Sequence, residues 1–202
     1  MRVTLADPRS CARELGHSRS VGYPKHPASC RSACMHADLY SSCVRVYDRG
    51  LAGLASVLRK GMQHAAERGV AEAEFLEARL YPDMYPLYRQ AQIVCDFARQ
   101  VPSRVLSLEV PAALDGTMDH AALQSQISEA RGFLKSLVRE QFDGRDEREV
   151  TFPIGDDPAT QSAARYVLGF ATPNFYFHLV TAYAILRHRG VPLGKAEYFG
   201  VT

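Results

Sequence analysis

The sequence predicts an all-α fold, an up-down four-helix bundle with a short β-hairpin before the last helix. Three observations support this prediction. Apolar residues recur every three or four positions in four long segments, the pattern of one face of an amphipathic helix. Strand-like alternation is confined to one short stretch near residue 150. The chain of 202 residues has the length of a single domain with a sizeable core.

The first helix is expected to start at Asp38 and to close near Gly69, because glycine readily adopts the left-handed conformation of a helix C-terminal cap. A short helix is then expected over residues 71–79, before a break at Tyr81 and Pro82. The apolar stripe of the first helix comprises Leu39, Cys43, Val46, Gly50, Leu54, Leu58 and Met62.

The second long helix is expected to begin with Asp83 as its N-cap, because an Asp side chain accepts a hydrogen bond from the first free amides. Pro86 then falls in the first turn, where its missing N–H costs nothing. Pro102 is expected to kink or end this helix. Its apolar stripe comprises Met84, Leu87, Ala91, Val94, Cys95 and Ala98.

The third long helix has two candidate N-caps, Thr117 and Asp119. After it, residues 150–154 alternate between apolar and polar, and the turn-forming residues 155–158 follow. This order predicts a small hairpin that pairs with residues near Gln161. The apolar stripe of the third helix comprises Leu123, Ile127, Ala130, Leu134, Leu137 and Val138.

The last helix is expected to run from Pro173 to about Arg189, after a separate helical stretch over residues 163–170. Thr172 is its expected N-cap, with proline at the first helical position. Gly190 is expected to stop it.

The composition excludes several functional classes. An apolar fraction of 47% and a charged fraction of 23% are typical of a soluble globular protein. No apolar run approaches the roughly 18 residues of a membrane span, so a membrane partner is not expected. A net charge of +2 favours no particular partner, and nucleic acid is not expected. The glycines form no G-x-G-x-x-G motif, P-loop or G-x-S-x-G elbow, which argues against nucleotide binding through the standard loops.

Residues 1–34 differ from the rest of the chain. They carry six Lys or Arg residues against two Asp or Glu, and no apolar periodicity. Such a segment cannot bury enough surface to offset its ordering entropy, so a disordered extension is expected. A transit peptide and a basic nucleic-acid-binding arm are alternatives. The favoured interpretation is a mis-assigned start, with translation from Met35 and one bundle domain over residues 35–200.

The five cysteines indicate no disulfide framework. Cys30 and Cys34 lack the paired spacing of a closed zinc site. Cys43 and Cys95 fall in apolar helical stripes, where a free thiol behaves as a small hydrophobic group. This usage fits a reducing compartment and predicts a cytoplasmic protein.

The candidate functional site lies on the second and last long helices. Asn174 and His178 are four residues apart and therefore share one helix face, which is otherwise apolar. Gln90 is placed to point inward from the earlier helix, and Tyr88 and Tyr176 lie nearby. These groups predict a buried hydrogen-bond network or a small ligand pocket. No metal is expected, since amides bind metals poorly; a divalent ion, if bound, would use His178 with Asn174 and Gln90.

Two motifs resemble an uncharacterised domain-of-unknown-function family of bacteria and fungi. The first is PDMYPL at residues 82–87, followed by Gln90 and Gln92, and the second is PNFYFH at residues 173–178. The family is similar to a branch of the DinB/YfiT-like helical bundles. That resemblance implies a bundle fold and three metal-binding histidines, of which His178 matches one, while Asn174 and Gln90 stand at or near the other two positions.

Three functional hypotheses follow. The first is a small-molecule-binding bundle with a degenerate metal site and no cofactor. The second, implied by the resemblance, is a metal-dependent or thiol-dependent transferase or hydrolase that uses His178 as a general base or lone metal anchor. The third is a structural homodimer formed by pairing of bundle faces. The residues leave open whether the protein is an enzyme.

Overall fold

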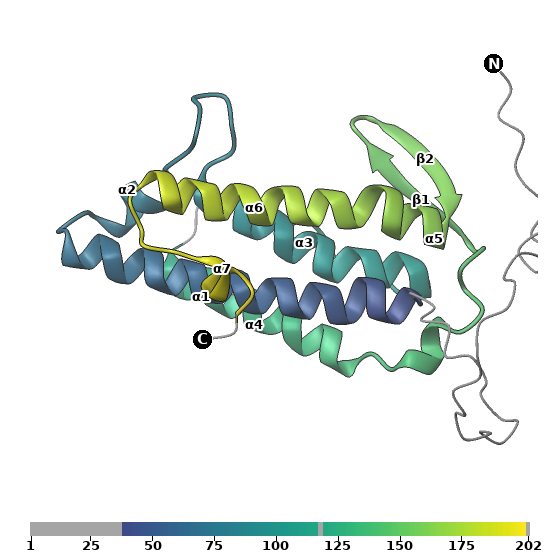
Figure 1. Ribbon diagram of the computed structural model, residues 1–202. Helices are drawn as coiled ribbons and strands as arrows, with labels where there is room; N and C mark the ends of the chain where they lie inside the picture. The colour runs from purple at the N-terminus through teal and green to yellow at the C-terminus, as the bar shows by residue number, and fades with distance from the viewer. Residues whose placement is uncertain (1–37, 117–118, 201–202) are drawn as a thin grey trace, which may run out of the picture. The chain divides into compact units, whose positions relative to one another are not determined.

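Four long helices form a bundle in the computed structural model, which describes residues 38–116 and 119–200 (Figure 1). α1 and α3 each pack against both α4 and α6. α1 is therefore diagonally opposite α3, and α4 is diagonally opposite α6. The predicted four-helix bundle is confirmed. The extension expected over residues 1–34 lies outside the described residues. The long helices are α1 Val46–Glu67, α3 Leu87–Leu106, α4 His120–Ser136 and α6 Thr172–His188.

The connection from α3 to α4 is a crossover rather than a tight turn. After Leu106 the chain turns back through Ser107, which has a left-handed backbone with φ 58°, and runs along α3 toward its start. α4 therefore begins beside the start of α3, and these two helices point the same way, whereas α1 and α6 run opposite to them (Figure 1). The directions of the four helices are thus up-down-down-up, without strict alternation. The hydrogen bonds that hold the returning segment join Gln100 to Pro111, Arg99 to Ala112, Asp96 to Leu114 and Gln92 to Gly116.

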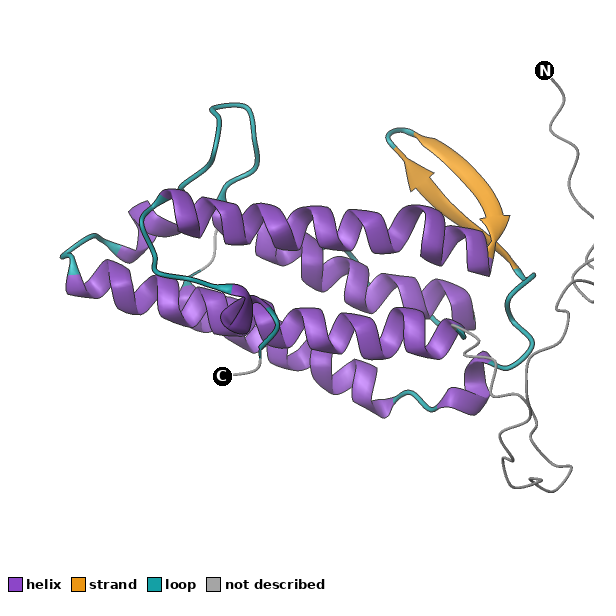
Figure 2. Cartoon of the chain, in the orientation of Figure 1, coloured by secondary structure: helices purple, strands orange, loops and turns teal. Residues whose placement is uncertain are grey.

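The predicted hairpin is confirmed. β1 Glu149–Ile154 pairs antiparallel with β2 Asp157–Ser162, with Val150 opposite Gln161, and lies outside the bundle near the start of α6 (Figure 2). Gly155 occupies the turn with φ 60°. The remaining short elements are the π-helical turns η1 Ser41–Arg45 and η3 Tyr166–Ala171, the 3₁₀ turn η2 Arg139–Phe142, and the short helices α2 Glu72–Leu76, α5 Ala163–Arg165 and α7 Lys195–Tyr198.

The start of α3 differs from the prediction, and of the two outcomes expected at Pro102, a kink or an end of the helix, the end does not occur. The N-cap is Pro86, not Asp83, because the residue before a proline is disfavoured in the α conformation and the helix cannot extend back through it. The Leu87 amide is satisfied instead by the Ala78 carbonyl at 2.9 Å. Pro102 lies inside α3, which continues to Leu106 because both flanking turns are buried.

The start of α4 is as predicted at one of its two candidate caps. Asp119 is the N-cap, and its carboxylate accepts a hydrogen bond from the Ala122 amide at 2.7 Å. Thr117 lies outside the described residues. The helix ends at Ser136, so Val138, expected on its buried stripe, is exposed instead.

No break separates α6 from the residues before it. Thr172 is not an N-cap, because Ala171 already has α-helical backbone angles and η3 continues directly into α6. A proline ring clashes with the carbonyl four residues earlier in a regular helix, and the wider π turn before Pro173 gives that carbonyl room. Gly190, with φ 87°, ends the helix region as expected.

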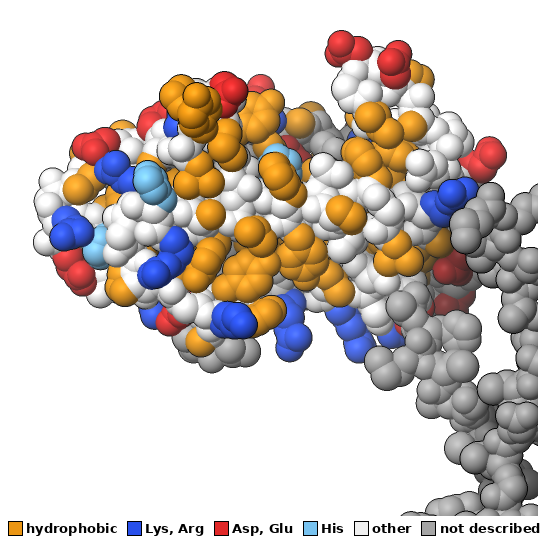
Figure 3. Space-filling model, turned by 45° about the horizontal axis from the view of Figure 1, so that its top comes forward, with side chains coloured by type: hydrophobic (Ala, Val, Ile, Leu, Met, Phe, Trp, Pro, Cys, Tyr) orange, Lys and Arg blue, Asp and Glu red, His pale blue; other side chains and the backbone are white. Residues whose placement is uncertain are grey.

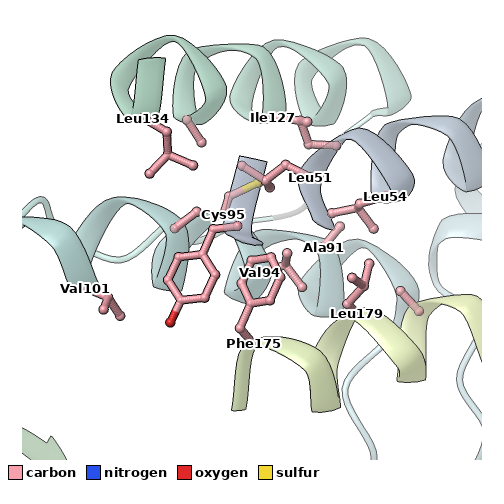
Figure 4. Close-up of a cluster of buried hydrophobic side chains, with 14 of the residues drawn as sticks. Leu51, Leu54, Ala91, Val94, Cys95, Val101, Ile127, Leu134, Phe175 and Leu179 are labelled. Carbon is pink, nitrogen blue, oxygen red and sulfur yellow. The ribbon is translucent and has the colours of Figure 1, made fainter. Parts of the chain in front are cut away.

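The core lies where the four long helices face one another (Figure 4). Leu51 of α1, Val94 of α3, Ile127 of α4 and Leu179 of α6 are almost completely buried there. Cys95 is buried among them as a free thiol, and burial raises its pKa to about 12. None of the described helices is both long and apolar enough to cross a membrane.

Candidate functional site

The imidazole of His178 on α6 pairs with the side-chain amide of Gln90 on α3. The two atoms joined, His178 Nδ1 and Gln90 Oε1, are 2.7 Å apart. The amide nitrogen of Gln90 donates to the backbone carbonyl of Tyr85, at 3.1 Å, in the loop that precedes α3. The loop therefore orients the amide, and the amide orients the imidazole.

This orientation determines the tautomer of the ring. Gln90 Nε2 is committed to a carbonyl acceptor, so Gln90 Oε1 faces His178 and accepts the proton of Nδ1–H. Burial, together with the positive charge of Arg89, lowers the pKa of His178 to about 4. At neutral pH the imidazole is uncharged, and Nε2 carries the lone pair. The site thus offers a hydrogen-bond acceptor at a fixed position.

Aromatic rings surround the imidazole of His178. Phe97 of α3 lies nearly parallel to it, with 6.4 Å between ring centroids, and Phe177 meets it edge-on at 5.2 Å. Sequence reasoning did not single out Phe97, although it lies seven residues after Gln90 and therefore on the same face of α3. Nor did it single out Arg89, whose charge acts on the ring.

Asn174 does not join the pair. Its amide nitrogen donates to the Phe170 carbonyl at 2.7 Å, a bond along its own helical segment. The network expected from three polar side chains thus contains two of them. Asn174 shares the helix face of His178 as expected, but the backbone one turn earlier takes its donor.

The two tyrosines expected near the site are partly buried and pack against the core. Tyr176 meets Phe175 edge-on, with 5.4 Å between ring centroids, and interacts electrostatically with Arg49 of α1. Tyr176 therefore lies on the side of α6 that faces α1. No hydrogen bond in the described part of the chain joins Tyr88 or Tyr176 to His178.

A metal centre of the kind implied by the DinB-like resemblance does not fit these residues. The Gln90 carbonyl oxygen already accepts the imidazole N–H. The amide nitrogen of Asn174 is bonded to its own helix, and its amide oxygen is a poor metal ligand. The three side chains therefore leave one imidazole nitrogen, His178 Nε2, and one neutral amide oxygen, Asn174 Oδ1, which is too few and too weak a donor set for a metal site. Within residues 38–116 and 119–200 no three His, Cys, Asp or Glu side chains come together as a metal-binding group.

Gln92, from the first of the two sequence motifs, and Asp96, one turn later on α3, hold the crossover segment. The Asp96 carboxylate accepts from the Leu114 amide at 3.0 Å and from Arg99 at 2.7 Å, and burial raises its pKa. Gln92 is completely buried and donates to the Gly116 carbonyl at 3.1 Å. Their role is thus to fix the chain against α3.

Comparisons with known proteins agree with this architecture. A crystal structure of a DinB family member protein from Shewanella denitrificans is similar, with 29% sequence identity and a TM-score of 0.75. The match covers 81% of this chain and 93% of that one. No curated protein matches the chain. The sequence profile of a domain of unknown function, DUF1993, matches residues 39–199, nearly all of the described bundle. The chain therefore belongs to the DUF1993 family, and its bundle has a DinB-like fold.

Proposed function

We propose that the protein is a small-molecule-binding bundle that works without a metal, with His178 Nε2 as the group that recognises the ligand. The pairing of His178 Nδ1 with Gln90 Oε1 at 2.7 Å is the observation that supports this function. It holds the ring in one tautomer, and the lowered pKa keeps it neutral. A fixed, neutral acceptor favours a ligand that donates a hydrogen bond.

The side chains around the acceptor favour an aromatic ligand. Phe97 and Phe177 flank the imidazole, and aromatic rings pack well against one another in offset or edge-on arrangements. The positive charge of Arg89 disfavours the cationic form of His178, and by the same repulsion it disfavours a cationic ligand beside the ring. The expected ligand is therefore an uncharged aromatic molecule with an O–H or N–H group.

The lowered pKa disfavours the enzymatic alternative in which His178 is a general base. A general base works best with a pKa near the operating pH, and a group with a pKa of about 4 accepts protons weakly at neutral pH. The amide partner Gln90 adds no negative charge that would raise its basicity.

The test titrates the full-length ¹⁵N-labelled protein with phenol and with toluene, which has the same ring but no donor. Phenol is expected to bind saturably and to shift the Nε2 resonance of His178, and toluene to bind more weakly. His178→Ala should abolish the difference between the two probes, whereas His120→Ala, a matched loss of an imidazole elsewhere, should keep it. Equal binding of both probes to the wild type, or a stoichiometric metal detected by plasma mass spectrometry, would contradict the proposal.

A second proposal, homodimerisation, rests on the outer face of α6. No Lys, Arg, Asp or Glu occurs between Arg165 and Arg187, and on α6 Phe177 is 59% exposed and Val180 48% exposed. Hydrophobic side chains gather on this side of the bundle between the projecting hairpin and the loop before α3 (Figure 3). An uncharged apolar helix face can pair with its own copy about a two-fold axis without charge repulsion.

Sedimentation velocity tests the homodimer. The wild type is expected to sediment as a dimer at micromolar concentration, and Phe177→Glu as a monomer. Leu108→Glu places the same charge at another exposed apolar position, on the crossover segment, and should remain dimeric. A monomeric wild type would show that this face does not pair.

A further inference from the structure

A second candidate site lies at the end of the bundle where α1 and α6 terminate. An open hollow of about 570 Å³ lies there, between the last turns of these two helices and α2. His178 is ten residues before the end of α6, about 15 Å away along the helix axis, so this hollow is separate from the site of the proposed function. The side chains that matter for its chemistry are His64, Arg68, Val70, Phe75, His188 and Arg189.

The two arginines of the hollow differ in their partners. Arg189 pairs with Glu74 of α2 at 2.9 Å, and its guanidinium lies 5.5 Å from the ring centroid of Phe75. Arg68 makes no ion pair with any carboxylate in the part of the chain that the structure describes. The charge of the Arg68 guanidinium is thus available to a ligand at the wall of the hollow.

His64 and Arg68 come together above Gly190. A Cβ placed on this glycine would lie 3.6 Å from Arg68 Nη1 and 3.8 Å from His64 Nε2. His64 Nε2 is buried and has no hydrogen-bond partner within the described residues. A second imidazole, His188, lines the same hollow. Three nitrogen-bearing side chains therefore surround a space whose other wall, from Val70 and Phe75, is apolar.

The helix ends themselves do not account for this arrangement. Carbonyls at a helix C-terminus carry partial negative charge that cations can offset. Here that need is partly met by backbone amides: the Val70 amide bonds to Ala65 O at 2.9 Å, and the Gly190 amide to Arg187 O at 3.0 Å.

We infer that this hollow binds an organic carboxylate, with the carboxylate on the Arg68 guanidinium and an apolar body against Val70 and Phe75. The planar guanidinium matches a carboxylate in a two-bond geometry, and the imidazoles of His64 and His188 can add hydrogen bonds to the same group. The apolar wall selects carboxylates that carry a hydrophobic group over small anions such as acetate.

The test uses benzoate as the probe and benzamide, its neutral isostere, as the matched control. The full-length ¹⁵N-labelled protein is titrated with each, and the amide signals of Gly190 and Val70 report on the hollow. Benzoate is expected to shift these signals saturably, and benzamide to bind at least tenfold more weakly. Arg68→Gln should weaken benzoate binding roughly tenfold or more, because it removes a charge-assisted hydrogen-bonded pair.

Two further variants sharpen the result. Arg49→Gln removes the same charge from the exposed surface of α1 outside the hollow and should leave benzoate affinity unchanged. Glu74→Gln removes the partner of Arg189 and should tighten binding severalfold, because it releases a second guanidinium. The inference is overturned if benzoate causes no saturable shift, if benzamide binds equally well, or if Arg68→Gln and Arg49→Gln have equal effects.

Discussion

His178 Nδ1 lies 2.7 Å from Gln90 Oε1 and no hydrogen bond joins His178 to Asn174, its neighbour one turn earlier on the same helix face. The pair bridges α3 and α6, which pack directly against each other. An imidazole whose proton is held by a neutral amide stays uncharged more readily than one held by a carboxylate. Burial and the charge of Arg89 keep the ring neutral, and Gln90 determines which ring nitrogen carries the proton.

A double-mutant cycle should separate these two neighbours. Gln90 is buried and His178 half-buried, so removing either member of the pair leaves the other unsatisfied, which costs about 1 to 3 kcal/mol. His178→Ala and Gln90→Leu should therefore couple by about 1 kcal/mol in urea denaturation, since the second change adds little once the pair is broken. His178→Ala and Asn174→Ala should be additive within about 0.5 kcal/mol. Strong coupling to Asn174 would indicate one three-residue network.

The stability of the fold should depend on the protonation of His178. Its pKa in the folded chain, about 4, lies below the ordinary value of about 6.5, so between these values the unfolded chain binds more protons. The free energy of unfolding is therefore highest above pH 6.5, where His178 is neutral in both states, and it decreases as the pH falls toward 4. From pH 7.5 to pH 5, the wild type should lose about 1 to 2 kcal/mol more than His178→Gln does. Equal losses measured by denaturation would mean that the imidazole titrates normally.

Replacing the Asp96 carboxylate should destabilise the fold more than replacing the carboxylate of a more exposed ion pair. Asp96→Asn offers an N–H group where the Leu114 amide needs an acceptor, and should cost about 1 to 3 kcal/mol and speed hydrogen exchange of that amide. Asp48→Asn breaks a more exposed pair with Arg131 and should cost less than about 1 kcal/mol. Unchanged exchange at Leu114 in Asp96→Asn would contradict this role.

Two glycine substitutions should have opposite effects. A Cβ at Gly53 of α1 would lie 2.0 Å from the Tyr198 carbonyl of α7, so Gly53→Ala should displace α7 and cost about 1 to 3 kcal/mol. Gly132 of α4 has no atom within 4 Å of such a Cβ, and Gly132→Ala should stabilise the helix by about 0.5 to 1 kcal/mol. Thermal melts of both variants test the pair, and a stable Gly53→Ala would show that α7 does not pack tightly there.

Local physical chemistry determined much of this fold. Three apolar stripes predicted the first three long helices, because helical periodicity brings residues three and four apart onto one face. The segment between Pro173 and Gly190 predicted the fourth. The cap at Asp119, the stop at Gly190 and the hairpin could also be predicted, since each depends on residues a few positions apart.

Tertiary structure decided the features in which distant residues compete for the same group. Proline alone suggested a kink or an end of α3 at Pro102, and burial of the following turn carries the helix past it. Likewise, periodicity placed Asn174 and His178 on one face, but could not show that the Phe170 carbonyl takes the first and Gln90 the second. The packing of α3 against α6 sets that choice, because it alone brings Gln90 to the imidazole, 88 residues away in sequence.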